Sequence, residues 1–180
     1  MKIIQSVFLL WALATTSVLG SETSASIVEK LNSFSQMREE LAKSLSKPWS
    51  EVTENDFKAV CAPVGMAFKK WAETNGFQAR QVSAKARNPK NLPTKFEQAI
   101  SKQFERNPKL EHIESDFALN GHKGPSIAVR IRVAEACLKC HGKKAERPEY
   151  IVQKYPNDRA FNFKVGDLRG FYWVWKSKGN

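Results

Sequence analysis

The chain has 180 residues, of which 26% are charged and 42% hydrophobic, and its formal net charge is +11. Beyond the N-terminus no apolar run is long enough to cross a bilayer, which argues against a multi-span membrane protein. No recognition motif accompanies the basic charge, so we expect no nucleic-acid binding and consider an acidic protein partner or an anionic surface more plausible.

Residues 1–20 have the pattern of a secretory signal peptide. Lys2 precedes an apolar run from Ile3 to Leu19, and Val18 and Gly20 stand where a cleavage site would place them. An uncleaved membrane anchor is the alternative. We expect export to the periplasm and a mature part of about 160 residues, a length typical of a single domain.

Residues 21–48 are predicted to form an N-terminal amphipathic helix. Its apolar residues recur at spacings of three, four and seven between Ser24 and Lys47, and Pro48 ends the pattern. These residues are Ile27, Leu31, Phe34, Leu41 and Leu45.

A second helix is expected from Glu51 to about Glu73, with Ser50 as its N-cap. Pro63 lies inside this helix, two residues after Cys61. Because proline removes a backbone donor, we expect a kink just after Cys61.

Strand patterns dominate the remainder of the chain. Residues 77–87 alternate loosely and residues 126–136 strictly, whereas residues 94–106 have helical spacing. Residues 170–176 form a last predicted strand, whose tryptophans we expect in the core or against a cofactor. Helices first and strands later favour an α+β fold with an antiparallel sheet.

The sequence Cys-Leu-Lys-Cys-His occupies residues 137–141 and is a C-x-x-C-H motif. In this pattern two thiols, here Cys137 and Cys140, add to the haem vinyl groups, and the adjacent His141 ligates the iron. A thioredoxin-like dithiol would need a β-α-β pattern upstream, which is not seen. A structural zinc site would need four donors, and only Cys61 and distant histidines are left to complete it.

The second axial position of the iron has few candidate ligands in this chain. They are Cys61, Met37, Met66, His112 and His122. Cys61 would by default be a small core residue. It is nevertheless the one thiol left once haem has consumed the other two, and a thiolate is a good ligand for ferric iron.

Four ordered segments, "CAPVG" from Cys61, "SAKARNPKNLPTKFE" from Ser83, "CLKCHG" from Cys137 and "YPNDRAFNFKVGDLRG" from Tyr155, together resemble the PAS-like c-type haem-binding family. That family contains free-standing exported cytochromes and sensor domains of membrane receptors. The resemblance implies a PAS-like haem c domain over residues 49–180.

The resemblance also implies one covalently bound haem c and axial ligation by a histidine and a helix cysteine, which are His141 and Cys61 here. Asn162, where a glycine is commoner, and the segment at 143–154 depart from the family pattern. Independently of the family, Arg87, Arg130 and Arg169 are candidate contacts for the haem propionates. The alternatives are that Arg87 shapes the loop at 87–89 and that Arg130 and Arg169 are exposed on the surface.

These residues predict a low-potential electron carrier. A thiolate opposite histidine stabilises ferric iron, and axial ligands shift haem potentials over about 0.8 V. No arrangement of acid and base groups suggests turnover, so we expect no enzyme. The alternative is a redox or gas (NO or CO) sensor in which Cys61 is displaced. A redox partner, acidic in charge, is expected in the first case, and a homodimer is possible in either.

Overall fold

The computed structural model describes residues 18–19, 22–119 and 122–176. The predicted signal peptide lies outside the described residues except for Val18 and Leu19, so it stays a prediction. None of the helices within the described ranges is long and apolar enough to cross a membrane.

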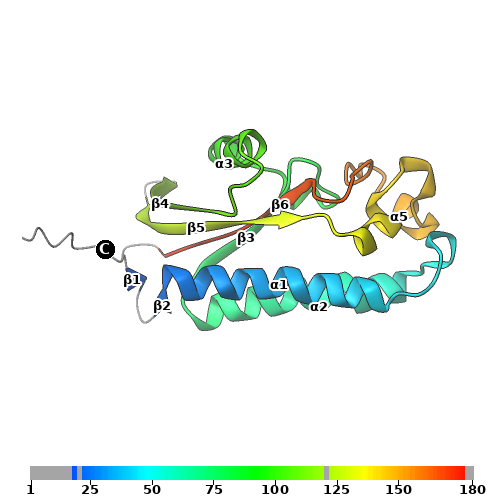
Figure 1. Ribbon diagram of the computed structural model, residues 1–180, viewed down its shortest axis with the longest axis horizontal. Helices are drawn as coiled ribbons and strands as arrows, with labels where there is room; N and C mark the ends of the chain where they lie inside the picture. Colours follow the sequence, from blue (N-terminus) through cyan, green and yellow to red (C-terminus); the bar gives the residue numbers. More distant parts are fainter. Residues whose placement is uncertain (1–17, 20–21, 120–121, 177–180) are drawn as a thin grey trace, which may run out of the picture.

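A four-stranded antiparallel sheet forms the centre of the fold, with the long helices α1 and α2 below one face and α3 on the other (Figure 1). The strands are β3 (Gln78–Val82), β4 (His112–Leu119), β5 (His122–Arg132) and β6 (Leu168–Trp175), in the spatial order β3-β6-β5-β4. Two short strands, β1 (Val18–Leu19) and β2 (Glu22–Thr23), pair before α1. The predicted α+β, PAS-like architecture is confirmed.

Five α-helices and four 3-10 turns accompany the strands within the described ranges. The helices are α1 (Ser24–Ser44), α2 (Glu54–Thr74), α3 (Lys95–Arg106), α4 (Leu138–His141) and α5 (Glu149–Lys154). The 3-10 turns are η1 (Trp49–Glu51), η2 (Pro89–Asn91), η3 (Glu135–Cys137) and η4 (Lys144–Glu146).

The start of α2 differs from the prediction. Thr53, not Ser50, is the N-cap: its hydroxyl accepts from the backbone N–H of Asp56, whose carboxylate accepts from the backbone N–H of Thr53. This reciprocal capping box satisfies two donors at once, which a lone Ser50 cap could not do. Ser50 lies in η1 instead, and Pro63 lies inside α2 as expected.

The predicted strand at 77–87 is shorter than expected and ends at Val82. The backbone then turns away, and the N–H of Ser83 donates to the carbonyl of Asn91 instead of to a neighbouring strand. Gly170 of β6 passes close to this point with φ +152, and a Cβ there would lie 2.1 Å from the Val82 carbonyl oxygen. Glycine is therefore required where β6 passes the end of its antiparallel neighbour β3.

The two faces of the sheet bury separate apolar clusters. Ile127, Val129 and Ile131 of β5 pack with α1 and α2, as their strict alternation predicts. Phe171 and Trp173 of β6 pack on the opposite face with α3. The tryptophans of β6 were expected either in the core or against a cofactor. The structure places them in the core beside α3, where Trp173 and Trp175 stack on each other.

Candidate haem site

The C-x-x-C-H motif forms a compact turn at the end of β5. After Arg132 the chain enters η3, which contains Cys137, and then the single turn α4, which ends at His141. A small buried cluster of Val133, Ala160 and Phe163 packs against Cys137 and Leu138.

Gly142 lets the chain leave this turn, because a Cβ there would lie 2.6 Å from the Leu138 carbonyl oxygen. The packing of Cys137 and Leu138 on the buried cluster therefore fixes the position of the motif.

His141 is oriented by a hydrogen bond from its ring. Nδ1 lies 2.7 Å from the carbonyl oxygen of Ala160, and since a carbonyl can only accept, Nδ1 carries the proton. Arg87 Nη2 lies 3.4 Å from the same nitrogen, but a protonated Nδ1 cannot accept, so that contact is not a hydrogen bond. This tautomer leaves Nε2 free to ligate a metal.

Burial, together with the cationic Arg169 and Arg87, holds the pKa of the His141 imidazole well below its usual value. The ring is therefore neutral, which is the form that binds metal.

The two motif thiols are also held in an apolar environment. Burial raises the pKa of Cys140 to about 11 and raises the pKa of Cys137 above its ordinary value. A thioether carries no charge, so the burial that disfavours a thiolate does not oppose attachment of these sulfurs to a vinyl carbon.

A cleft brings Cys61 together with the motif. It is lined by the C-terminal part of α1, the first half of α2, the end of β5, the motif and the start of β6, and its walls include Cys61, Cys137, Cys140 and His141. The space between its atoms totals about 620 Å³, part of it open to solvent, and about 50 Å³ of it is wide enough for water. The donor set fits a haem. Because haem is larger than the open part of the cleft, the side chains that line the cleft would have to move apart to admit it.

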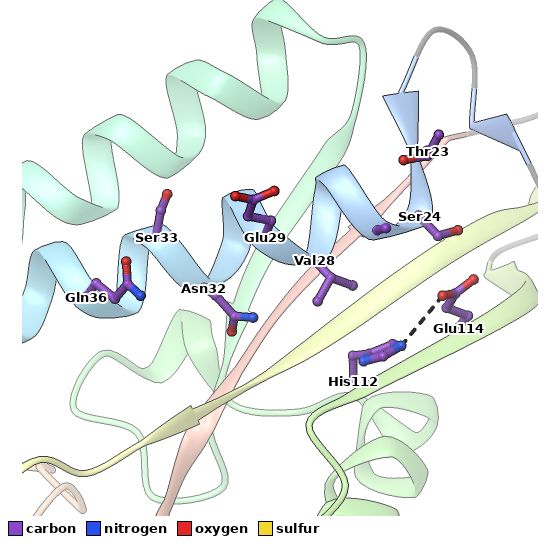
Figure 2. Close-up of a pocket in the computed structure, with 10 residues that line it drawn as sticks. Thr23, Ser24, Val28, Glu29, Asn32, Ser33, Gln36, His112 and Glu114 are labelled. Atoms are coloured by element: carbon purple, nitrogen blue, oxygen red, sulfur yellow. Dashed lines mark ion pairs between the residues drawn. The ribbon is translucent and has the colours of Figure 1, made fainter.

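The other candidates for the second axial position do not line this cleft. Met37 packs against the α1–α2 core, and Met66 is 65% exposed on α2. His112 lies in an open groove of about 770 Å³ between α1 and the edge strand β4, 3.6 Å from Glu114 (Figure 2). His122 belongs to β5, and its side chain lies outside the described part of the chain.

Two of the three predicted propionate contacts lie near the motif. Arg87 is buried, and its Nη2 donates to the Cys140 carbonyl at 2.7 Å, while its Nε lies 3.4 Å from the Asp158 carboxylate. Arg169 lines the cleft and donates to Ser83 Oγ at 2.8 Å. Burial, with Arg38 and Arg87 nearby, lowers the pKa of Arg169 to about 10, so it stays charged at neutral pH.

Arg130 is not at the site. It is buried on the α3 side of the sheet, where its guanidinium donates to the carbonyls of Phe104, Asn107 and Leu110 at 2.5, 2.8 and 2.7 Å. Strand alternation separates it from the cleft, because Ile131 points to the α1–α2 side and Arg130 to the other. This placement gives no support to a propionate contact at Arg130.

Arg38 of α1 was missed from the sequence. It lines the cleft and donates to Tyr172 Oη at 2.8 Å and to Gln81 Oε1 at 3.1 Å. A signal was present: Arg38 follows Phe34 by four residues and so interrupts the apolar stripe of α1 with a cation.

Asn162, the departure from the family's glycine, is the non-glycine residue with positive φ in the described part of the chain, at 54°. Asparagine tolerates this conformation, and its Oδ1 accepts from the backbone N–H of Lys144 at 3.0 Å. The substitution therefore keeps the turn beside the motif.

None of the three cysteines, all of which lie in the described part of the chain, forms a disulfide. Within the described ranges, no three His, Cys, Asp or Glu side chains are grouped so as to hold a metal ion by themselves.

The fold and the cleft define a PAS-like domain that carries a C-x-x-C-H turn facing a helix cysteine. Residues 19–176 match the model of the Tll0287-like family, and the chain belongs to that family. Among solved structures it is similar to the cyanobacterial heme-protein Tll0287, with 41% sequence identity, a TM-score of 0.75, and coverage of 87% of this chain and 95% of that one. A comparison with curated proteins finds no match.

Proposed function

We propose that this chain binds one haem covalently through Cys137 and Cys140 and carries single electrons at low potential. The observation that carries the proposal is the meeting of Cys61 of α2 with the whole C-x-x-C-H motif at one cleft. The description of its 41% identical relative as a heme-protein supports it. The haem would supply one-electron iron chemistry; the remaining roles belong to the protein.

His141 and Cys61 are the proposed axial ligands. The Ala160 carbonyl fixes the His141 ring and leaves Nε2 available. A thiolate at Cys61 would add negative charge to the ferric state and lower the potential. With both axial positions held by the protein, the function needs only that electrons enter and leave, so no enzyme activity is proposed.

Arg169 and Arg87 are the proposed partners of the propionates, with Arg38 beside them. The guanidiniums of these three arginines lie at or near the cleft. The Asp158 carboxylate pairs with Arg87 and also with a fourth arginine, Arg147, at 3.1 Å, so it neutralises only one of the four charges. The local charge therefore remains positive. Two propionates and a thiolate would neutralise it, which favours an anionic cofactor at this place.

The proposed electron route is intermolecular. A one-electron donor protein of low potential would reduce the ferric protein, and an acceptor would reoxidise it, with no proton or group transferred. The net charge of +11 favours acidic partners. The signal-like residues 1–20 and the chemistry of C-x-x-C-H attachment both favour a periplasmic location.

The test is production with a haem-attachment system, followed by a denaturing gel and a redox titration. The wild type should retain haem on the gel and titrate as a single one-electron couple at low potential. The Cys137→Ala, Cys140→Ala double variant should lose haem on the gel. Retention of haem by that double variant, or a wild type without haem, would refute the proposal.

A redox or gas sensor is the second candidate, favoured by the position of Pro63. Proline has no N–H to donate to the Ala59 carbonyl, so α2 is weakened beside Cys61 and could let this ligand move. Carbon monoxide added to the reduced protein distinguishes the two functions. A spectral shift indicates release of Cys61 and a sensor, whereas an unchanged spectrum indicates a carrier with fixed ligands.

A further inference from the structure

The side chain of Tyr150, on α5, has a buried hydroxyl that lacks a hydrogen-bond partner among the described residues. Removing a phenol oxygen from water without giving it a partner is unfavourable. Such groups are few in folded proteins, and each calls for an explanation, such as a partner that binds later.

Helix α5 lies along the part of α2 that leads to Cys61. Lys154 of α5 pairs with Glu54 at the start of α2, and the Tyr150 ring lies 5.7 Å from the ring of Phe57. Phe57 and Cys61 are four residues apart and so share one face of α2. The contacts therefore place the ring of Tyr150 against Phe57, one helical turn of α2 before Cys61.

The electrostatics of Tyr150 agree with this placement. Burial raises the pKa of its phenol above the ordinary value, and the neighbouring thiols of Cys140 and Cys61 act in the same direction, while Arg87 opposes them. The group consequently stays protonated at neutral pH, so it has a proton to donate to a hydrogen bond.

We propose that Tyr150 is a positioning residue whose hydroxyl donates a hydrogen bond to the sulfur of Cys61 when that sulfur ligates the haem. This inference rests on the ligand pair put forward under Proposed function. Cys140 is the weaker acceptor, because its sulfur becomes a neutral thioether on attachment. A thiolate at Cys61 is charged, and charge-assisted hydrogen bonds are the stronger ones.

A hydrogen bond to the sulfur has a definite effect on the couple. It withdraws electron density from the ligand, so it favours the reduced state and raises the potential. It also weakens the hold of Cys61 on the iron. Tyr150 would thus set how readily this ligand leaves, which is the property that separates a carrier from a sensor.

The test compares Tyr150→Phe with Tyr155→Phe by redox titration. Tyr155 also packs on Phe57, with ring centroids 6.3 Å apart, so its variant removes a hydroxyl from the same aromatic group. Tyr150→Phe should make the potential more negative by up to about 59 mV, a tenfold change in the ratio of oxidised to reduced protein. Tyr155→Phe should change it little.

The wild type offers a second readout that needs no stable variant. The iron–sulfur stretching frequency should shift when the oxidised protein is moved from H₂O to D₂O. An absent shift, or equal potentials in the two tyrosine variants, overturns the inference about Tyr150.

A Cys61→Ser variant shows whether a negative result refutes only the role of Tyr150 or also the proposed ligation by His141 and Cys61. If Cys61→Ser changes the ferric spectrum while Tyr150→Phe behaves as Tyr155→Phe does, Cys61 is a ligand and only the Tyr150 inference is wrong. If Cys61→Ser leaves the ferric spectrum unchanged, the ligand pair is wrong and the Tyr150 inference falls with it.

Discussion

The two faces of the sheet both bury arginine, and they treat it differently. On the α3 face, the Arg130 guanidinium is fully engaged by three backbone carbonyls, and Arg80 pairs with the buried Glu97 at 2.8 Å. On the α1–α2 face, Arg38 and Arg169 line a cleft and donate to neutral groups. An arginine whose donors are taken up by the fold serves stability, whereas the buried Nε of Arg38 lacks a hydrogen-bond partner among the described residues and so has a donor left for a ligand.

The largest expected effect is at β6, the strand whose side chains enter the cores of both faces. Gly170→Ala would place a methyl group 2.1 Å from the Val82 carbonyl oxygen at a positive φ. We expect a loss of about 3–4 kcal/mol in the free energy of unfolding, measured with urea.

Gly166→Ala is the matched control, because Gly166 also has positive φ but its Cβ would meet nothing within 4 Å. That variant should lose only about 1–2 kcal/mol. Equal losses in the two variants would show that Gly170 does not approach the Val82 carbonyl as closely as described.

The α3 face is tested by Arg130→Met. The change removes a donor from three backbone carbonyls, of which that of Phe104 belongs to a fully buried residue, so we expect a loss of about 2–4 kcal/mol in urea unfolding. The haem spectrum and potential should stay as in the wild type, because Arg130 lies on the other side of the sheet. A shift in potential as large as that of a cleft variant would contradict the separation of the two faces.

The cleft face is tested by Arg169→Met, with Arg169→Lys as the variant that keeps the charge. Removing a cation beside the proposed propionates and thiolate disfavours the reduced, more negative state. We expect the potential to fall by about 60 mV, a tenfold change in the equilibrium. Arg169→Lys should fall clearly less; an equal fall in both variants would mean that geometry, not charge, carries the effect.

The smallest expected effect concerns the start of α2, the helix that carries Cys61. Thr53→Ala removes the N-cap and should cost about 1 kcal/mol in urea unfolding at neutral pH. The hydrogen bond from the Thr53 backbone, followed by that from its hydroxyl, lowers the pKa of Asp56.

A lowered carboxyl pKa gives stability that is present above the unfolded-state pKa and is lost as the pH falls through the folded-state value. The difference between wild type and Thr53→Ala should therefore shrink as the pH is lowered through the acid range. A difference that grew in acid would contradict the capping box.

Much of this fold could be predicted because periodicity reports burial. The stripes of α1 and α3 and the alternation of β5 each face one core, so their sequence patterns are strong. The edge strand β4 exposes His112, Glu114 and Asp116, so its pattern is polar and weak. Helix α5 has 6 residues, too few for its periodicity to show in the sequence.

Site residues could be predicted where the chemistry of haem attachment fixes their spacing in the sequence. They could not be predicted where only tertiary contacts bring them to the site. The motif at 137–141 and Cys61 could be found from residue type and family resemblance. Arg38 left a trace as a cation in an apolar stripe. Tyr150 left none, because its relation to Cys61 exists only through the packing of α5 on α2.

The central claim is that Cys61 and His141 hold one haem between them. It is tested most directly by the electron paramagnetic resonance spectrum of the oxidised protein, compared with that of Cys61→Ser. The account predicts a single low-spin ferric signal in the wild type and its replacement by a different signal in the variant. Identical signals in the two proteins, or a high-spin signal in the wild type, would contradict it.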